Sequence, residues 1–255
     1  MKQLSVITVT YNAKSTIERT LRSVEHQTAC NIIEHVIIDG ASSDGTLDLL
    51  DAYYQKNKDR YPIVVKSEPD KGLYDAMNKG LSAATGQFVV FLNSGDVFHE
   101  PTTVEQVFKH DVSNVGVIYG YTDVVDDEGK FLAKRFLTPP KHLTWKSFKD
   151  GMLVCHQSFY ARRTLCPSYN MTYRFSADID WCINVMKAGN IAHMENLNTN
   201  IVLTDYLNEG LTTKNHKASL IERFNIMKHH YGLFTTILHH IKFVFRALGR
   251  RIKKL

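Results

Sequence analysis

Polar side chains follow four short apolar stretches in the first hundred residues, and carboxylates stand out among them. The stretches, each with its polar cluster, are 4–10 with Tyr11-Asn12, 35–38 with Asp39 to Thr46, 63–67 with Glu68 to Gly72, and 88–92 with Asn93 to Asp96. If the stretches are strands of one parallel sheet, the clusters meet at its carboxyl edge, where open α/β sheets bind ligands. Carboxylates gathered there, without a glycine-rich phosphate loop, indicate a phosphorylated ligand held through a metal ion.

Two of these carboxylates suit different chemical tasks. Asp39 ends a strongly apolar stretch and could accept hydrogen bonds from the N–H groups of uracil or guanine; the alternative role, capping the loop before a helix, suits Asp44 better. Asp96 suits Mg²⁺ or Mn²⁺, which prefer oxygen ligands from one or two carboxylates plus substrate phosphates. Its alternative role is a cap or turn residue before Pro101. A haloacid-dehalogenase-type phosphatase is excluded, because its two aspartates are one residue apart and Asp39 and Asp44 are not.

A second pair of carboxylates, Asp178 and Asp180, opens a helical pattern far along the chain. At positions i and i+2 the two side chains point in different directions, so we expect only one of them in a site. One is a candidate catalytic base, and the other would serve the helix cap or dipole. The alternative is that both are ordinary acids of a helix N-terminus.

The elements that position these residues alternate between strand and helix. Helical spacing recurs at about 17–24, 46–54 and 73–84, between the four apolar stretches. This alternation predicts a doubly wound α/β sheet. Beyond residue 100 we expect strands at 115–119, 121–125, 130–137 and 159–160, and a helix over 178–188. The chain thus divides into a nucleotide-binding first half and a mixed second half suited to an acceptor.

Composition limits the class of protein. With 255 residues, 44% hydrophobic and 22% charged, the chain can form one large domain or one domain with an appendage. The four cysteines show no short paired spacing, so they predict buried cytosolic thiols and neither a zinc site nor a redox pair. We expect no signal peptide, and no stretch approaches the ~20 apolar residues of a membrane span.

The C-terminal tail holds the excess of positive charge. No acidic residue follows Glu222, whereas eight lysines and arginines do, and without them the formal net charge of +5 becomes −3. From Phe234 onward Ile237, Leu238, Ile241, Val244, Phe245, Leu248 and Ile252 share one helical face, opposite His239, Lys242, Arg246, Arg250 and Lys253. Such a helix can lie in an anionic membrane surface. The alternative is a terminal helix packed on the domain with its charges in solvent.

Taken together, the motifs resemble family 2 glycosyltransferases, the inverting sugar-nucleotide enzymes of the GT-A fold, and among them the bacterial capsule, exopolysaccharide and colanic-acid group. The segments that carry the resemblance are 5–12, 36–46, 67–80, 86–96, 155–158 and 176–181. We therefore expect a GT-A domain over 1–215 and a basic helical tail over 216–255. Within the domain, the nucleotide-sugar half would cover about 1–98 and the acceptor half about 99–215.

The resemblance implies a role for each matching residue. Tyr11, Asp39, Lys71 and Asn78 would bind the donor nucleotide. Asp96 would hold Mn²⁺ or Mg²⁺, Asp178 would be the general base, and Asn93, His156, Gln157 and Asp180 would lie in or beside the pocket. For His156 the alternative is a buried histidine bonded to backbone.

The implied activity is metal-dependent transfer of a sugar from a nucleotide-sugar donor, with inversion, in bacterial cell-surface polysaccharide synthesis. The acceptor would be a hydroxyl of a glycan or of a polyprenyl-diphosphate-linked saccharide, reached from the cytoplasmic face of the membrane; no nucleic-acid partner is expected. A nucleotidyltransferase would need an N-terminal glycine-rich loop, and residues 10–20 contain no glycine. A catalytically silent homologue that scaffolds a polysaccharide-assembly complex is the other alternative, against which the presence of Asp96 and Asp178 argues.

Overall fold

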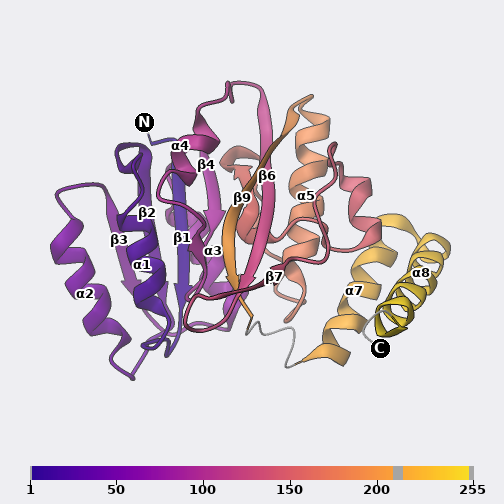
Figure 1. Cartoon of the computed structure of the whole chain (residues 1–255), viewed down its shortest axis with the longest axis horizontal. Coiled ribbons are helices and arrows are strands. Elements are labelled where there is room, and N and C mark those ends of the chain that lie inside the picture. The colour runs from indigo at the N-terminus through magenta and orange to yellow at the C-terminus, as the bar shows by residue number, and fades with distance from the viewer. Residues whose placement is uncertain (1, 209–214, 253–255) are drawn as a thin grey trace.

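The computed structural model describes residues 2–208 and 215–252, with side chains up to residue 246, as a mixed sheet flanked by helices (Figure 1). The strands are β1 (Leu4–Thr10), β2 (Ile33–Asp39), β3 (Ile63–Ser67), β4 (Phe88–Phe91), β5 (Val97–Phe98), β6 (Val115–Val125), β7 (Phe131–Lys134), β8 (Phe159–Arg162) and β9 (Glu195–Leu207). The α-helices are α1 (Ile17–Glu25), α2 (Thr46–Asn57), α3 (Leu73–Ala83), α4 (Thr103–Phe108), α5 (Ala177–Ile191), α7 (His216–Tyr231) and α8 (Leu233–Ile252). Short 3₁₀ turns are η1 (Cys30–Ile32), η2 (Trp145–Asp150), η3 (His156–Ser158) and η4 (Arg163–Leu165).

The sheet joins a parallel half to a mixed half in the order β3-β2-β1-β4-β8-β6-β9-β5, with β7 added beside β6. The first four strands run parallel, as the alternation of strand and helix predicts. β8 is antiparallel to both β4 and β6, and β9 then runs parallel to β6. The predicted α/β class and its mixed second half are therefore confirmed, and the four polar clusters lie at one edge of the sheet.

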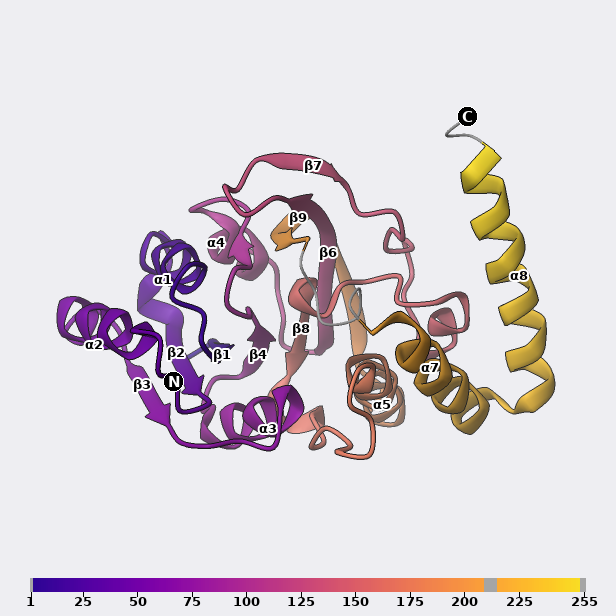
Figure 2. The ribbon, with the colours of Figure 1, turned by 90° about the horizontal axis from the view of Figure 1, so that it is seen from below.

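Helices cover both faces of the sheet (Figure 2). One face packs against α1, α2 and α4 around a core that includes Ile17, Leu50 and Val104. The other packs against α3 and α5 around Met77 and Trp181. These layers bury the parallel strands from both sides, which is why most residues of those strands are apolar.

The second half differs from the expected pattern in its strands. Residues 115–125 form one strand, not two, and the register of β6 against β9 shifts around Gly120. A Cβ at Gly120 would lie 2.6 Å from the carbonyl oxygen of Ile201, so the close approach of β9 requires glycine there. β5, α4 and β9 were not predicted, whereas α7 lies within the helical tail expected over 216–255. β9 begins with Glu195 to Asn200, which are polar except for Leu197, and has no clear alternation, so sequence periodicity does not reveal it.

The two C-terminal helices lie beside the second half of the sheet. α8 packs against α7 and η2 through its polar side, where His239 and Lys242 pair with Asp150 at 3.3 and 2.6 Å. The apolar residues exposed along α8 are Leu233, Phe234, Ile237, Leu238, Ile241, Val244 and Phe245. The predicted positions Leu248, Arg250, Ile252 and Lys253 lie outside the residues whose side chains are described. Across the described residues, no helix is both long and apolar enough to cross a membrane.

Candidate active site

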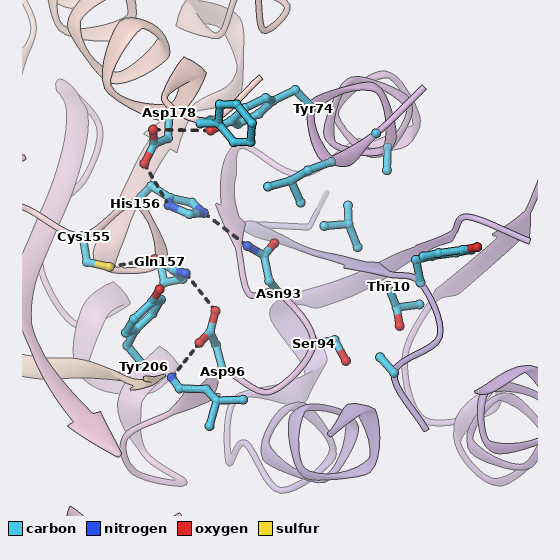
Figure 3. Close-up of a pocket in the computed structure, with 18 of the residues that line it drawn as sticks. Thr10, Tyr74, Asn93, Ser94, Asp96, Cys155, His156, Gln157, Asp178 and Tyr206 are labelled. Atoms are coloured by element: carbon cyan, nitrogen blue, oxygen red, sulfur yellow. Dashed lines mark hydrogen bonds and ion pairs between the residues drawn. The ribbon is translucent and has the colours of Figure 1, made fainter. Parts of the chain in front are cut away.

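A pocket of about 690 Å³ opens at the carboxyl edge of the sheet, and both halves of the chain line it (Figure 3). From the first half come Tyr11, Asp70, Tyr74, Asn93 and Asp96, and from the second half Arg135, His156, Gln157, Asp178, Tyr206 and Arg223. Residues more than eighty positions apart thus meet in one cavity. Its first-half residues include members of three of the strand-end clusters, which were expected to lie close together.

Asp96 lies at the floor of this pocket, just beyond β4. The preceding Gly95 has φ +98°, and a Cβ there would lie 2.5 Å from the Leu207 side chain, so only glycine allows this turn. The Asp96 carboxylate accepts a hydrogen bond from the Leu207 backbone N–H at 3.0 Å and from Gln157 Nε2 at 2.8 Å. Burial nevertheless raises the pKa of Asp96 to about 7, because these donors do not replace the water that a charged carboxylate loses.

The surroundings of Asp96 fit a divalent cation. Asn93 Oδ1 is buried beside the pocket and has no hydrogen-bond partner in the described part of the chain. An amide oxygen and a carboxylate are the hard oxygen ligands that Mg²⁺ and Mn²⁺ prefer. A cation bound at Asp96 would favour its charged form, and a bond from Asn93 Oδ1 to that cation would satisfy the unpaired oxygen. The residues present therefore suit the metal that the resemblance implies, with few protein ligands and space for substrate oxygens.

Asp178 enters the pocket from the opposite side, in the first turn of α5. One of its carboxylate oxygens lies 3.5 Å from the Tyr74 hydroxyl and the other 3.7 Å from His156 Nδ1. On its far side, His156 Nε2 lies 3.5 Å from the Asn93 amide nitrogen. Because an amide N–H can only donate, this arrangement selects the neutral imidazole with its proton on Nδ1, toward Asp178. Burial lowers the pKa of His156, which favours that neutral form.

Asp180 was expected in or beside the pocket, but its side chain does not line the pocket. The His230 ring from α7 meets its carboxylate at 2.7 Å, and Asn184 donates to it at 3.2 Å. The buried pair joins α5 to α7. Of the two aspartates only Asp178 lines the pocket, because the helical turn points them to different neighbours.

Asp39 is fully buried and serves the loop that follows β2. Its carboxylate accepts hydrogen bonds from the Ser42 backbone N–H, the Ser42 hydroxyl and the Ser67 hydroxyl at 2.9, 2.5 and 2.7 Å. Asp44 accepts a hydrogen bond from the N–H of Thr46 at 3.0 Å at the start of α2. This is the role before a helix that the sequence favoured for Asp44. Contact between Asp39 and a nucleotide base stays a prediction. Tyr11, whose side chain is 64% exposed, is at the pocket rim.

Lys71 and Asn78 do not line the pocket. The Lys71 side chain is exposed, and the backbone N–H of Lys71 binds Asp75. Asn78 instead holds the backbone of Tyr169, accepting from its N–H at 2.6 Å and donating to its carbonyl at 3.1 Å. A segment assigned to the donor therefore also joins α3 to the second half of the chain.

Several pocket residues were not identified from the sequence. Asp70 and Tyr74 fall within segment 67–80, which carries part of the family resemblance. That resemblance was the signal that could have identified them as pocket residues. Arg135 and Arg223 fall in stretches without a motif. The Arg135 guanidinium binds the carbonyls of Leu137, Met152 and Leu153 and shapes the rim. Arg223 comes from α7, and the described residues offer its guanidinium no hydrogen bond or ion pair.

Solved structures of other proteins share this fold. The chain superposes on S. aureus TarS 1-349 in complex with UDP with a TM-score of 0.67, at 16% identity, covering 97% of this chain and 72% of TarS 1-349. It superposes on the mannosyltransferase PcManGT from Pyrobaculum calidifontis, in complex with GDP-Man and Mn²⁺, with a TM-score of 0.60 at 15% identity, covering 99% and 81% of the two chains. The architecture is therefore that of GT-A type glycosyltransferases.

Sequence comparison gives the family. Residues 5–168 match the model of glycosyl transferase family 2. A PGL/p-HBAD biosynthesis glycosyltransferase of Mycobacterium bovis (strain BCG / Pasteur 1173P2) is 32% identical over 186 residues, 70% of this chain and 68% of the relative. WfaP of Escherichia coli, a UDP-Glc:alpha-D-GlcNAc-diphosphoundecaprenol beta-1,3-glucosyltransferase, is 28% identical over 229 residues, 89% and 86% of the two chains. The chain belongs to glycosyl transferase family 2, as the motifs predict.

Proposed function

We propose that this protein transfers a sugar from a nucleotide-sugar donor to a hydroxyl group of a lipid-linked saccharide, with inversion at the anomeric carbon. The observation that carries the proposal is that Asp96 and Asp178 enter one pocket from different sides and different halves of the chain (Figure 3). A diphosphate leaving near Asp96 and a hydroxyl attacking near Asp178 would be on opposite sides of the sugar. A single displacement requires that arrangement, and it needs no covalent sugar–enzyme intermediate.

Asp178 is the proposed general base. Its carboxylate would take the proton of the acceptor hydroxyl as that oxygen attacks the sugar, a contribution of typically ~10²–10⁴-fold in rate. The neutral His156 ring, held on its other side by Asn93, would present Nδ1–H to Asp178 and keep the carboxylate turned into the pocket. Tyr74 supports the other carboxylate oxygen from α3.

Asp96 and Asn93 Oδ1 are the proposed ligands of Mn²⁺ or Mg²⁺. When bound, the cation would supply positive charge to the leaving diphosphate. The buried, unpartnered Asn93 oxygen and the raised pKa of Asp96 support this assignment. The Mn²⁺ present in the PcManGT structure shows that a protein of similar fold binds that ion.

The proposed donor is a UDP-sugar and the proposed acceptor a polyprenyl-diphosphate-linked saccharide. The name of WfaP supports both, since it states a UDP-glucose donor and a diphosphoundecaprenol acceptor. We place the protein at the cytoplasmic face of the membrane, where α8 would insert its exposed apolar residues between lipids. Lys242 and Arg246 lie on the other side of this helix, where they bind Asp150 of the domain, so the proposed membrane contact is made by the apolar residues.

The deciding experiment offers UDP-Glc, UDP-GlcNAc and GDP-Man to the purified protein with Mn²⁺ and a synthetic polyprenyl-diphosphate-GlcNAc acceptor. Transfer is followed by mass spectrometry, and the anomeric configuration of the product by NMR. Inverted product from a UDP-sugar is the expected result, with Asp178→Asn as the inactive control and Asp180→Asn as the folded, active one. Retention of configuration would contradict the mechanism, and nucleotide binding without turnover of any donor would favour the scaffold alternative.

A further inference from the structure

A second cluster of ionisable side chains lies outside the pocket, on three neighbouring strands. His99 follows β5, Asp205 belongs to β9, and Asp123 belongs to β6, where it stands directly opposite Asp205 in the register. β6 and β9 run side by side in Figure 1. One donor atom of each residue lies within 4.8 Å of the others. None of the three lines the pocket, although the next residues of β9, Tyr206 and Leu207, do.

The charges of this cluster do not balance. His99 Nδ1 pairs with Asp205 at 2.7 Å, which leaves the Asp123 carboxylate as a second negative group across the strand pair. Like charges directly opposite on paired strands destabilise a sheet. Burial raises the pKa of Asp205, partly offset by His99, while the charge of Asp123 raises it further. The cluster therefore has a local excess of negative charge.

Asp123 is the residue that points to a ligand. It is 9% exposed, its carboxylate oxygen faces the other two side chains, and within the described ranges it makes no hydrogen bond or ion pair. Lys134 is its neighbour in the register on β7, yet the two form no ion pair, and Arg19 acts on Asp205 only at longer range. An unpaired buried carboxylate is costly unless a positive group completes its surroundings.

We propose that His99, Asp123 and Asp205 bind a divalent first-row metal ion such as Zn²⁺, at a site separate from the donor pocket. One imidazole nitrogen and two carboxylate oxygens are ligands that Zn²⁺ accepts, whereas Mg²⁺ and Ca²⁺ favour oxygen alone. Three protein ligands leave a fourth position for water. With bonds of about 2.0–2.2 Å the donor atoms must move closer than 4.8 Å, which rotation of the partly exposed His99 and Asp205 side chains allows.

The ion would tie together the strands that shape the pocket. Asp96 precedes His99 by three residues in the chain. Leu207, whose backbone N–H binds Asp96, follows Asp205 by two residues. A metal joining β5, β6 and β9 would fix these two segments relative to each other. Its expected role is structural, because none of its ligands reaches the pocket.

The test measures Zn²⁺ binding to the full-length protein after treatment with EDTA and dialysis. Competition with a chromophoric chelator gives the affinity for wild type, Asp123→Asn and His99→Gln. We expect at least about a 10-fold loss of affinity in both variants. Two matched controls should keep wild-type affinity at this site: Asp96→Asn, which alters the pocket, and His110→Gln, which removes an exposed histidine elsewhere.

A melting measurement separates a metal site from an ordinary buried carboxylate. In EDTA, Asp123→Asn should melt at the wild-type temperature or higher, since it removes an unpaired negative charge, and it should lose the rise in melting temperature that Zn²⁺ gives to wild type. Equal Zn²⁺ affinity in wild type, Asp123→Asn and His99→Gln would overturn the proposal. Loss of Zn²⁺ binding in either control variant, His110→Gln or Asp96→Asn, would also overturn it.

Discussion

The two halves of the sheet build their parts of the pocket in different ways. In the first half, Asp96 and its neighbours follow parallel strands directly, so the chain itself delivers them to the carboxyl edge. In the second half, Asp178 and His156 come from a helix start and a 3₁₀ turn, and packing between distant segments brings them together. The strand-end residues are therefore readable from the hydrophobic pattern, whereas the choice of Asp178 and His156 required the resemblance of their segments to a known family.

The largest expected effect tests the first half. Asp96→Ala should lower transfer by at least about 10³-fold and remove Mn²⁺-dependent nucleotide binding, because electrostatic stabilisation of a leaving diphosphate is worth several kcal/mol. Calorimetric titration with UDP, with and without Mn²⁺, measures the binding. Ser94→Ala, a change in the same pocket wall without loss of charge, is the control. Unchanged Mn²⁺-dependent affinity in Asp96→Ala would remove this residue from the metal site.

The matching test of the second half is Asp178→Asn. Donor binding should persist while turnover falls by at least ~10²-fold, since only proton removal is lost. Asp180→Asn should leave turnover near wild type, because Asp180 does not line the pocket. It should lower stability, because the contact of Asp180 with His230 of α7 joins α5 to α7. Steady-state rates and nucleotide titrations on both variants decide the assignment. The reverse pattern would move the base to Asp180.

The contact between the halves gives a smaller effect. Asn78→Ala removes two hydrogen bonds to the Tyr169 backbone and leaves its N–H and carbonyl unpaired, at a cost of about 1–3 kcal/mol in the free energy of unfolding. Urea titration measures it. Ser82→Ala, one turn further along α3 on the exposed side, is the control and should change little. If both variants unfolded at the same urea concentration, Asn78 would not join the halves.

Substitutions on the exposed apolar side of α8 are expected to change how the protein partitions to membranes. Ile241→Glu with Phe245→Glu should lower binding to anionic liposomes by roughly 10-fold or more, since burying each side chain in lipid contributes about 1.5–3 kcal/mol. Phe131→Glu, on the exposed strand β7, removes a comparable apolar side chain elsewhere and serves as the control. Co-sedimentation at low salt compares the three proteins. Equal sedimentation of all three would contradict membrane binding through α8.

The smallest effect per unit of change in conditions concerns the acid stability of the protein. Burial lowers the pKa of His35 to about 3, between Thr8 and Tyr53. The folded state therefore binds fewer protons than the unfolded state between about pH 6.5 and 3, so stability is full above that window and falls as the pH drops through it. The slope is about 1 kcal/mol per pH unit. Urea unfolding from pH 7 to 4 should show a shallower slope for His35→Gln than for wild type.

Sequence reasoning reached the parallel strands and helices of the first half because each has a clear apolar pattern. It missed β9, whose opening residues Glu195 to Asn200 are polar except for Leu197, since Asn196 and Asn198 donate to loop carbonyls instead of filling the core. Asp96 and Asp178 were found from motifs. Arg135 and Arg223 were not, because only tertiary packing brings their segments to the pocket.

The Asn78 contact with Tyr169 belongs to the more firmly held side of the cavity. Tyr169 also stacks between Tyr74 and Trp181, with ring centroids 5.4 and 5.1 Å apart, so this side of the cavity is fastened by both hydrogen bonds and aromatic packing. The opposite rim, from Arg135 to Met152, is held by hydrogen bonds between one guanidinium and loop carbonyls. The two sides of the cavity therefore differ in how they are held: aromatic packing adds to the hydrogen bonds at Tyr169, whereas the Arg135 rim depends on one guanidinium group.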